Sequence, residues 1–255
     1  MPRACKRSGT RQGVTPPPGL FGLIAPCYDL LNRLISFGQD KGWRRTAAAW
    51  CGSLARLGVL DVATGTGDQL LALSRLPSAP HHLVGIDAAE EMLWRGRRKV
   101  KALRRPVCVH FCQAMAHSLP FKNRFFGAVT MAFAIRNFAD RLQALGEARR
   151  VLVPGGRLVI LEAGVPDKPP LRLLFRVYCR YVMPTLAGLL SGQRRAYRYL
   201  SDAIFSFPAP QEFSRLLAQA GFTVLRVESL AFGAARIFVA STGSSDDAPG
   251  DSFSA

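Results

Sequence analysis

Acidic residues are scarce in this chain. Its 255 residues include 17 aspartates and glutamates against 34 lysines and arginines, which gives a formal net charge of +17. From Lys168 through Ser201 there is no acidic residue at all. This excess predicts attraction to an anionic partner, which would be nucleic acid, an acidic membrane surface or an acidic protein. The alternative, given equal weight, is that the additional arginines lie on solvated faces and bind nothing.

Cysteine pairs and long apolar runs are also missing. The six cysteines form no C-x-x-C pair and the four histidines add no metal-ligand pattern, so we expect reduced thiols and no metal. No stretch of about 20 residues is free of charge, and this argues against a transmembrane helix. A hydrophobic content of 49% indicates a globular protein, which we expect in the cytoplasm.

The two ends of the chain differ in composition from its middle. Residues 1–19 are basic and include three consecutive prolines, and residues 242–255 are small, polar and acidic. Such segments bury little apolar surface, so we expect a disordered basic arm and a disordered tail. Residues 20–241 are predicted to form a single domain, with N-terminal helices over 20–55 and a helical insertion or lid over 165–207.

Short apolar runs alternate with helical stretches from Leu60 onward. Strands are expected at 59–64, 82–88, 106–114, 126–134 and 157–163, helices at 68–76, 90–103, 140–152 and 208–222, and a closing hairpin at 223–241. The "PGG" at 154–156 is expected to separate a helix from the fifth strand, because it can neither continue the helix nor pair in a ladder. Near-continuous apolar strands indicate a parallel sheet covered by helices, the doubly wound α/β pattern.

A glycine-rich turn follows the first strand in "LDVATGTGD" (60–68). Gly65 and Gly67 let the backbone approach a ligand closely, and Asp87, about 20 residues further on, can accept hydrogen bonds from a ribose diol. A nicotinamide fingerprint would carry a third glycine, which this loop lacks. The pattern D-x-A-T-G-T-G-D resembles the first motif of S-adenosylmethionine-dependent methyltransferases instead.

Longer segments narrow the family. They are "YDLLNRLISFG" (28–38), "LDVATGTGD" (60–68), "SLPFKNRFFGAVTMAFAIRNF" (118–138), "RVLVPGGRLVILE" (150–162) and "YRYL" (197–200). Together they resemble the UbiE/MenG-type C-methyltransferases of ubiquinone and menaquinone biosynthesis, over about residues 21–241. The resemblance implies a Rossmann-like fold with a mostly parallel, seven-stranded sheet and helices on both faces. It also implies S-adenosylmethionine as cofactor and a reduced polyprenyl quinone as substrate, methylated on a ring carbon.

The resemblance also implies which residues contact the cofactor. They are Thr64, Gly65, Thr66, Gly67, Asp87, Met115, Ala116 and Ala132. The chain departs from the family pattern at several positions, one of which is Ala132, where many relatives carry Ser. Met115 stands where Asn or Asp is usual, Asp40 begins a pair that is His-Arg in relatives, and Ala63 replaces a glycine of the first motif. These departures put cofactor affinity and substrate choice in doubt, but not the fold.

The segment "MAFAIRNF" (131–138) places Arg136 and Asn137 at the end of the fourth strand, where open α/β sheets bind ligands. A ring carbon is a good nucleophile once its neighbouring hydroxyl ionises, and an arginine beside that oxygen would favour the anion. We therefore expect Arg136 and Asn137 to be catalytic. The alternative is a purely structural salt bridge from Arg136 to a helix-terminal carboxylate such as Asp140. Glu162 is interpreted as a carboxylate at the rim of the crevice, with proton acceptance as the alternative.

Aromatic residues at both ends of the domain are candidates for the substrate pocket. One interpretation is that a quinone pocket is lined by Tyr28, Asp29, Tyr197 and Tyr199. The alternative is that the tyrosines are half-buried side chains whose hydroxyl groups are exposed to solvent. The basic run at 95–105 is interpreted as a solvated helix away from the crevice.

The helix expected at 171–184 is both cationic and apolar. Arg172, Arg176 and Arg180 are four residues apart, with leucines and tyrosines between them. Such a helix binds anionic lipid headgroups at the inner membrane face, or serves as a lid whose arginines are solvated. Both interpretations stay open.

We expect the reaction that converts demethylmenaquinol to menaquinol. The alternative within the family is methylation of a polyprenyl methoxybenzoquinol for ubiquinone. The high positive charge also suggests methylation of RNA, protein or another small molecule, but no N-P-P-Y-like tetrapeptide or stacking-aromatic cluster is present, so no nucleic acid partner is expected. Met115 and Asp40 suggest a scaffold without activity as a further alternative. Whether the chain forms a homodimer stays open.

Overall fold

The structure is a computed structural model that describes residues 16–17, 19–77, 80, 82–102, 108–192 and 194–243. The disordered basic arm expected at 1–19 and the tail expected at 242–255 lie almost entirely outside these residues. Within the described part of the chain, no single helix is long and apolar enough to cross a membrane. The segments Leu20–Ile35 and Asp40–Ala49 are long and apolar enough when they are taken together, but the chain bends by 91° between them.

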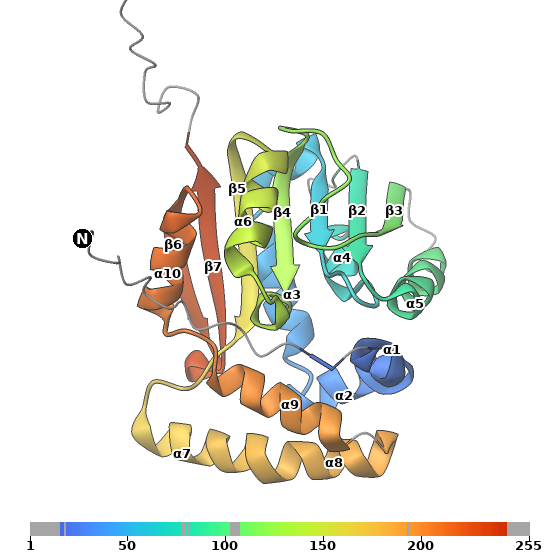
Figure 1. Ribbon diagram of the computed structural model, residues 1–255, viewed down its shortest axis with the longest axis vertical. Coiled ribbons are helices and arrows are strands. Elements are labelled where there is room, and N and C mark those ends of the chain that lie inside the picture. Colours follow the sequence, from blue (N-terminus) through green and yellow to red (C-terminus); the bar gives the residue numbers. More distant parts are fainter. Residues whose placement is uncertain are drawn as a thin grey trace, which may run out of the picture.

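A seven-stranded sheet forms the centre of the molecule (Figure 1). Its order is β3 (Cys108–Gln113), β2 (His82–Asp87), β1 (Val59–Val62), β4 (Phe126–Ala132), β5 (Leu152–Ala163), β7 (Ala235–Thr242) and β6 (Phe222–Leu230). The first five strands are parallel, and β7 runs antiparallel to both β5 and β6. The mostly parallel sheet expected from the sequence is confirmed, with the closing hairpin as its last two strands.

Helices cover both faces of this sheet. On one face, α3 (Asp40–Ala49), the 3₁₀ segment η2 (Gly52–Leu57) and α4 (Asp68–Leu73) pack on β1, β4, β5 and β7, and α5 (Glu90–Lys101) packs on β2 and β3. On the other face, α6 (Arg141–Val151) and α10 (Pro210–Gln219) pack on a core that includes Phe126, Phe213 and Phe238. Because the central strands are buried from both sides, nearly every residue of β1 and β4 is apolar.

A helical cap lies beyond the carboxyl ends of the parallel strands (Figure 1). It consists of α1 (Leu20–Ile24), η1 (Ala25–Cys27) and α2 (Tyr28–Ile35) from the N-terminal part, and of α7 (Pro169–Val177), the π-helical turn η4 (Tyr178–Val182), α8 (Met183–Ser191) and α9 (Arg194–Phe205) from the segment after β5. The cap has its own apolar cluster, in which Leu31, Met183 and Tyr197 are buried. It places two parts of the chain that are distant in sequence over the same edge of the sheet.

Two boundaries differ from the sequence prediction. The strand β5 begins at Leu152, so the "PGG" at 154–156 lies inside it. Leu152 and Arg157 pair with β4, and the "PGG" falls in the irregularity between these two pairs. Bulges of this kind are where a strand tolerates proline and glycine. In addition, β4 ends at Ala132, and Arg136 and Asn137 lie in a short 3₁₀ turn, η3 (Ile135–Asn137).

Candidate active site

The glycine loop connects β1 to α4 in a conformation that brings its backbone close to Asp87. Gly65 and Gly67 have φ values of 56° and 82°, in the left-handed region that favours glycine, and Ala63 adopts 54° without being a glycine. The Gly65 amide donates to Asp87 Oδ2 at 2.8 Å, and the Ala89 amide donates to Oδ1 at 2.9 Å. Burial raises the pKa of Asp87, although these amides act to lower it. The carboxylate is thereby fixed at the end of β2 with lone pairs left for two hydroxyl donors.

The other expected cofactor residues lie along the same edge of the sheet. Met115 and Ala116 follow β3, Asp87 ends β2, and Ala132 ends β4, so these positions flank the loop that follows β1. The side chain of Met115 is 50% exposed, which leaves it free to pack on a flat ring. Thr64 and Thr66, in contrast, are buried within the loop. The structure thus brings together the cofactor residues expected from the sequence.

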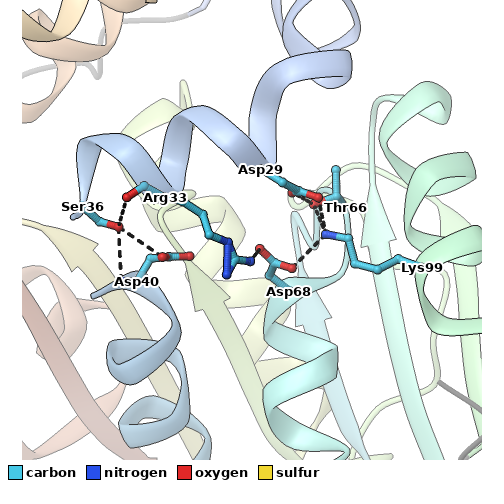
Figure 2. Close-up of polar contacts among 7 residues, drawn as sticks. All are labelled: Asp29, Arg33, Ser36, Asp40, Thr66, Asp68 and Lys99. Atoms are coloured by element: carbon cyan, nitrogen blue, oxygen red, sulfur yellow. Dashed lines mark hydrogen bonds and ion pairs between the residues drawn. The ribbon is translucent and has the colours of Figure 1, made fainter. Parts of the chain in front are cut away.

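Polar contacts join α2 to this loop (Figure 2). The Thr66 hydroxyl donates to Asp29 Oδ1 at 2.5 Å, and Lys99 Nζ lies 2.5 Å from Asp29 Oδ2 and 2.8 Å from Asp68 Oδ1. Arg33 of α2 pairs with the other oxygen of Asp68 at 3.5 Å. Although burial acts to raise it, the pKa of Asp68 is lowered, because Lys99 and the nearby arginines stabilise its carboxylate.

Two sequence interpretations are corrected by these contacts. Asp29 was expected to line a substrate pocket, but its carboxylate binds the Thr66 hydroxyl and Lys99 instead. Lys99 was assigned to a solvated helix, but it reaches the glycine loop and donates to Thr66 Oγ1 at 3.0 Å. The sequence spacing could have indicated this contact. Lys99 comes three residues after Gly96, which is buried in α5, and residues three apart lie on the same side of a helix.

A cavity of about 610 Å³ lies between the cap and the carboxyl ends of β4 and β5. Five of the residues that line it are expected site residues: Tyr28, Arg136, Asn137, Tyr197 and Tyr199. The ring of Tyr28 also lies over Gly65, at 3.8 Å from where a Cβ on that glycine would be. This tyrosine therefore forms a wall shared by the cavity and the glycine loop.

Other lining residues were not found from the sequence as pocket residues. They include Asp40, Trp43 and Arg44 of α3 and Phe133 after β4. Asp40 is buried, with Oδ1 accepting from the Ser36 hydroxyl at 3.1 Å, and its Oδ2 has no hydrogen-bond partner among the described residues. Asp40, Trp43 and Arg44 lie on a helix before the glycine loop, and no motif connects that helix to the cavity. Phe133 belongs to the segment 131–138, in which only Arg136 and Asn137 were expected to be site residues.

Arg136 forms a buried ion pair with Glu162 at the end of β5. One guanidinium nitrogen of Arg136 donates to Glu162 Oε1, and the Arg136 amide donates to Oε2 at 3.3 Å. Two expectations were wrong here: Glu162 is fully buried and not a rim carboxylate, and the partner of Arg136 is not Asp140, which caps α6 by accepting from Gln143. A buried ion pair of this kind fixes η3 against β5, because removing either partner would leave a buried charge.

Tyr199 holds the side chain of Asn137. Its hydroxyl donates to Asn137 Oδ1 at 2.9 Å, which leaves the amide nitrogen of Asn137 free to act as a donor toward the cavity. Burial raises the pKa of Tyr199 to about 12, while Arg136 and Arg141 act to lower it, so the phenol is protonated at neutral pH. Tyr197 is buried, with a hydroxyl that has no hydrogen-bond partner in the described part of the chain.

The sequence matches the model of the ubiE/COQ5 methyltransferase family over residues 14–242. The chain belongs to this family. A demethylmenaquinone methyltransferase of Thermus thermophilus is 51% identical over 221 residues, which cover 86% of this chain and 98% of that protein. The enzyme of the same name from Deinococcus radiodurans is 42% identical, with coverages of 86% and 90%. A ubiquinone/menaquinone biosynthesis C-methyltransferase UbiE of Geobacter sulfurreducens is also 42% identical, with coverages of 88% and 87%.

Solved structures with low sequence identity share the fold. A SAM-dependent methyltransferase from Aquifex aeolicus aligns with a TM-score of 0.53 at 23% identity, covering 72% of this chain and 80% of that one. The [4+2]-cyclase SpnF aligns with a TM-score of 0.63 at 16% identity, covering 93% and 100%. Together with the family match, this supports the Rossmann-like methyltransferase fold and S-adenosylmethionine as the methyl donor of this ubiE/COQ5-family chain.

The residues present fit that donor. Asp87 offers lone pairs for a ribose diol, and the left-handed glycines allow close approach of the loop backbone. Beside the loop, Asp61 Oδ2 and Gln69 Oε1 are buried acceptors without a partner among the described residues, as expected where a ligand ammonium binds. Met115 supplies apolar contact but no side-chain hydrogen bond to an adenine.

Asp61 makes the stability of the ligand-free protein depend on pH. Burial raises its pKa to about 6, against the Thr130 hydroxyl and the charge of Arg44, which lower it. The folded state therefore binds the proton more tightly than the unfolded chain, and stability falls as the pH rises from about 4 to about 6. Asp61→Asn should remove this fall, so the variant gains about 2 kcal/mol relative to wild type between pH 4 and pH 7.5.

Urea unfolding of the ligand-free proteins at both pH values measures this difference. The control is Asp202→Asn, the same change at an exposed position on α9, for which the difference should be constant. A constant difference for Asp61→Asn as well would show that Asp61 is ionised at both pH values.

Proposed function

We propose that this protein transfers a methyl group from S-adenosylmethionine to a ring carbon of a polyprenyl naphthoquinol, converting demethylmenaquinol to menaquinol. The observation that carries the proposal is the apolar cavity that has Arg136 and Asn137 in its wall and shares Tyr28 with the glycine loop. A cavity of this size takes a fused ring and the first part of an apolar tail. The names of the similar Thermus and Deinococcus proteins support the naphthoquinol.

The chemistry requires alignment and an ionised ring hydroxyl. When bound, S-adenosylmethionine supplies an electrophilic methyl group, which a neutral phenol ring attacks slowly. The amide nitrogen of Asn137, oriented by Tyr199, can donate to the ring oxygen. Arg136 lines the same wall, and although its charge is balanced by Glu162, its Nε has no partner among the described residues and can also donate. Such donors stabilise negative charge on that oxygen. Arg136 stays protonated and is therefore not the base.

Asp40 is our candidate for the acceptor of the ring hydroxyl proton. When the ring carbon takes the methyl group, the sulfur–methyl bond breaks, the proton on that carbon is lost and the hydroxyl is restored, so the reaction releases one proton overall. Glu162 is unsuitable because both of its oxygens accept hydrogen bonds from Arg136, and Oε1 also accepts from the Ala163 amide. Asp40 lines the cavity and has an oxygen without a partner among the described residues.

Methyl transfer to reduced quinones tests the proposed function. The protein is incubated with S-adenosylmethionine labelled in the methyl group and, in separate reactions, with a reduced naphthoquinone, a reduced benzoquinone or RNA. We expect label in the naphthoquinol ring. Label in the benzoquinol alone would point to ubiquinone biosynthesis, and label in RNA but in neither ring would contradict the proposal.

The role of Arg136 is tested through its partner. Glu162→Gln should destabilise the protein by about 3 kcal/mol, because it leaves the guanidinium buried without its counter-charge. The double variant Arg136→Gln/Glu162→Gln removes both charges and should recover most of that loss. Urea unfolding measures both values.

Turnover of the folded double variant then separates two roles. If Arg136 stabilises the ionised ring oxygen, turnover should fall by about 100-fold while cofactor affinity stays that of wild type. Wild-type turnover in the double variant would show that Arg136 only holds the corner between η3 and β5.

We also infer peripheral contact with an anionic membrane at the mouth of the cavity. Five large apolar residues of its lining are exposed: Phe37 (76%), Phe232 (73%), Leu174 (66%), Val177 (45%) and Val182 (41%). Exposed apolar side chains around a cavity opening are costly in water and fit the acyl boundary of a bilayer. Arg176 of α7 and Arg180 of η4 are exposed and supply charge for anionic headgroups. A polyprenyl tail could then pass from the bilayer directly into the cavity.

Sedimentation with lipid vesicles tests this contact. Wild type should bind vesicles that contain phosphatidylglycerol and should not bind vesicles of phosphatidylcholine alone. Phe37→Ser should weaken binding by about tenfold, because it removes an inserted aromatic ring. The matched control is Phe125→Ser, at an exposed site (54%) beside the opposite end of β4. Equal binding by both variants would place the membrane contact elsewhere.

A further inference from the structure

Arg44 is a buried cation without a counter-ion in contact. Its side chain belongs to α3 and the residue is 6% exposed. Among the other buried arginines that the structure describes, Arg136 pairs with Glu162 and Arg236 with Asp167. Arg141 has no contacting carboxylate but donates to the backbone oxygens of Ile135 and Arg136.

For Arg44, the described residues provide no ion pair within contact distance, and its Nε has no hydrogen-bond partner. Its charge acts only at longer range on Asp61 and Asp68, where it lowers the pKa of each carboxyl group. Burying a charge in this way is costly, so the arrangement suits a site that an anion completes.

The location of Arg44 limits what that anion can be. Gln69 of α4 donates to the backbone oxygen of Arg44 at 3.4 Å, so α3 lies against the helix that follows the glycine loop. The guanidinium carbon lies 5.2 Å from the centre of the Phe133 ring, and both residues line the cavity. Arg44 therefore stands at the boundary between the glycine loop and the cavity, where the reacting ends of donor and acceptor must meet.

The polar atoms around Arg44 match the two charges of an α-amino acid. The charge of Arg44 acts on Asp61, whose burial otherwise raises the pKa of that group. Asp61 Oδ2 and Gln69 Oε1 are buried acceptors without partners in the described part of the chain, and Arg44 supplies N–H donors. Acceptors fit an ammonium, and a guanidinium fits a carboxylate in a bidentate manner.

We propose that Arg44 binds the carboxylate of the methionine end of the cofactor and so fixes the sulfonium beside the cavity. The proposal rests on S-adenosylmethionine as the methyl donor. The other anion that this position could receive is the ionised oxygen of the quinol. The two differ in which ligand Arg44 recognises, so binding of each ligand alone distinguishes them.

Calorimetry with two cofactor analogues tests the proposal without turnover. S-adenosylhomocysteine carries the carboxylate, and 5′-(3-aminopropylthio)adenosine has the ammonium but lacks the carboxylate. Arg44→Gln should weaken binding of S-adenosylhomocysteine by about 30-fold and leave binding of the decarboxylated analogue unchanged. Arg44→Lys, which keeps the charge but not the fork of donors, should lie between wild type and Arg44→Gln.

A neighbouring arginine provides the matched control. Arg45 is the next residue on α3 and is exposed, so Arg45→Gln should bind both analogues like wild type. Thermal unfolding without ligand should give Arg44→Gln and Arg45→Gln melting temperatures no lower than that of wild type, because Arg44→Gln removes a buried charge that has no contacting counter-ion. A melting temperature lowered only in Arg44→Gln, with equal losses for both analogues, would show a structural role and overturn the proposal.

The remaining outcomes are also decisive. Equal affinity of wild type and Arg44→Gln for S-adenosylhomocysteine, with weakened binding of a naphthoquinol, would assign Arg44 to the quinol oxygen and contradict the proposal. If wild type binds neither analogue, the methyl donor itself is wrong and the proposed function fails with it. If wild type binds S-adenosylhomocysteine and transfers no methyl group to a quinol, the assignment of Arg44 still stands and only the substrate is wrong.

Discussion

The contacts of Lys99 with Asp29, Asp68 and Thr66 join three segments that are far apart in the sequence. They fix α2 of the cap, the glycine loop after β1 and the end of α5 against one another (Figure 2). Because α2 also carries Tyr28, which lies over Gly65, the position of one cavity wall follows from these contacts. The apolar cluster of the cap gives the cavity its shape, but it is the polar contacts that set where the cavity lies relative to the loop.

Buried charges near the cavity fall into two kinds. Arg136 and Glu162 neutralise each other and hold η3 against β5, so this corner is rigid before any ligand arrives. Arg44 and Asp61 lack such direct partners, and they lie where a zwitterionic ligand would complete them. The first kind stabilises the fold, while the second carries a cost that binding can offset, as is common at functional sites. The ion pair therefore holds Arg136 in the cavity wall, where it can also donate to a ring oxygen, whereas Arg44 has no contacting counter-ion among the described residues.

The sequence predicted the parts of the molecule that follow from local patterns. Near-continuous apolar runs gave the parallel sheet, and the glycine loop with Asp87 at the end of the second strand gave the cofactor edge. The rest depended on contacts between distant segments. The partner of Arg136 is 26 residues away on β5, and Lys99 reaches a loop more than 30 residues earlier. No spacing rule connects such pairs, so Glu162 was interpreted as a rim carboxylate and Lys99 as a solvated cation.

The account rests on a quinol ring bound in the cavity beside the glycine loop. A crystal structure of the protein with S-adenosylhomocysteine and a naphthoquinol tests this most directly. We expect the thioether sulfur near Tyr28 and Gly65, and the ring in the cavity with one of its oxygens within hydrogen-bond distance of Asn137 or Arg136. A naphthoquinol bound outside the cavity, or one separated from the sulfur by the Tyr28 side chain, would contradict the account.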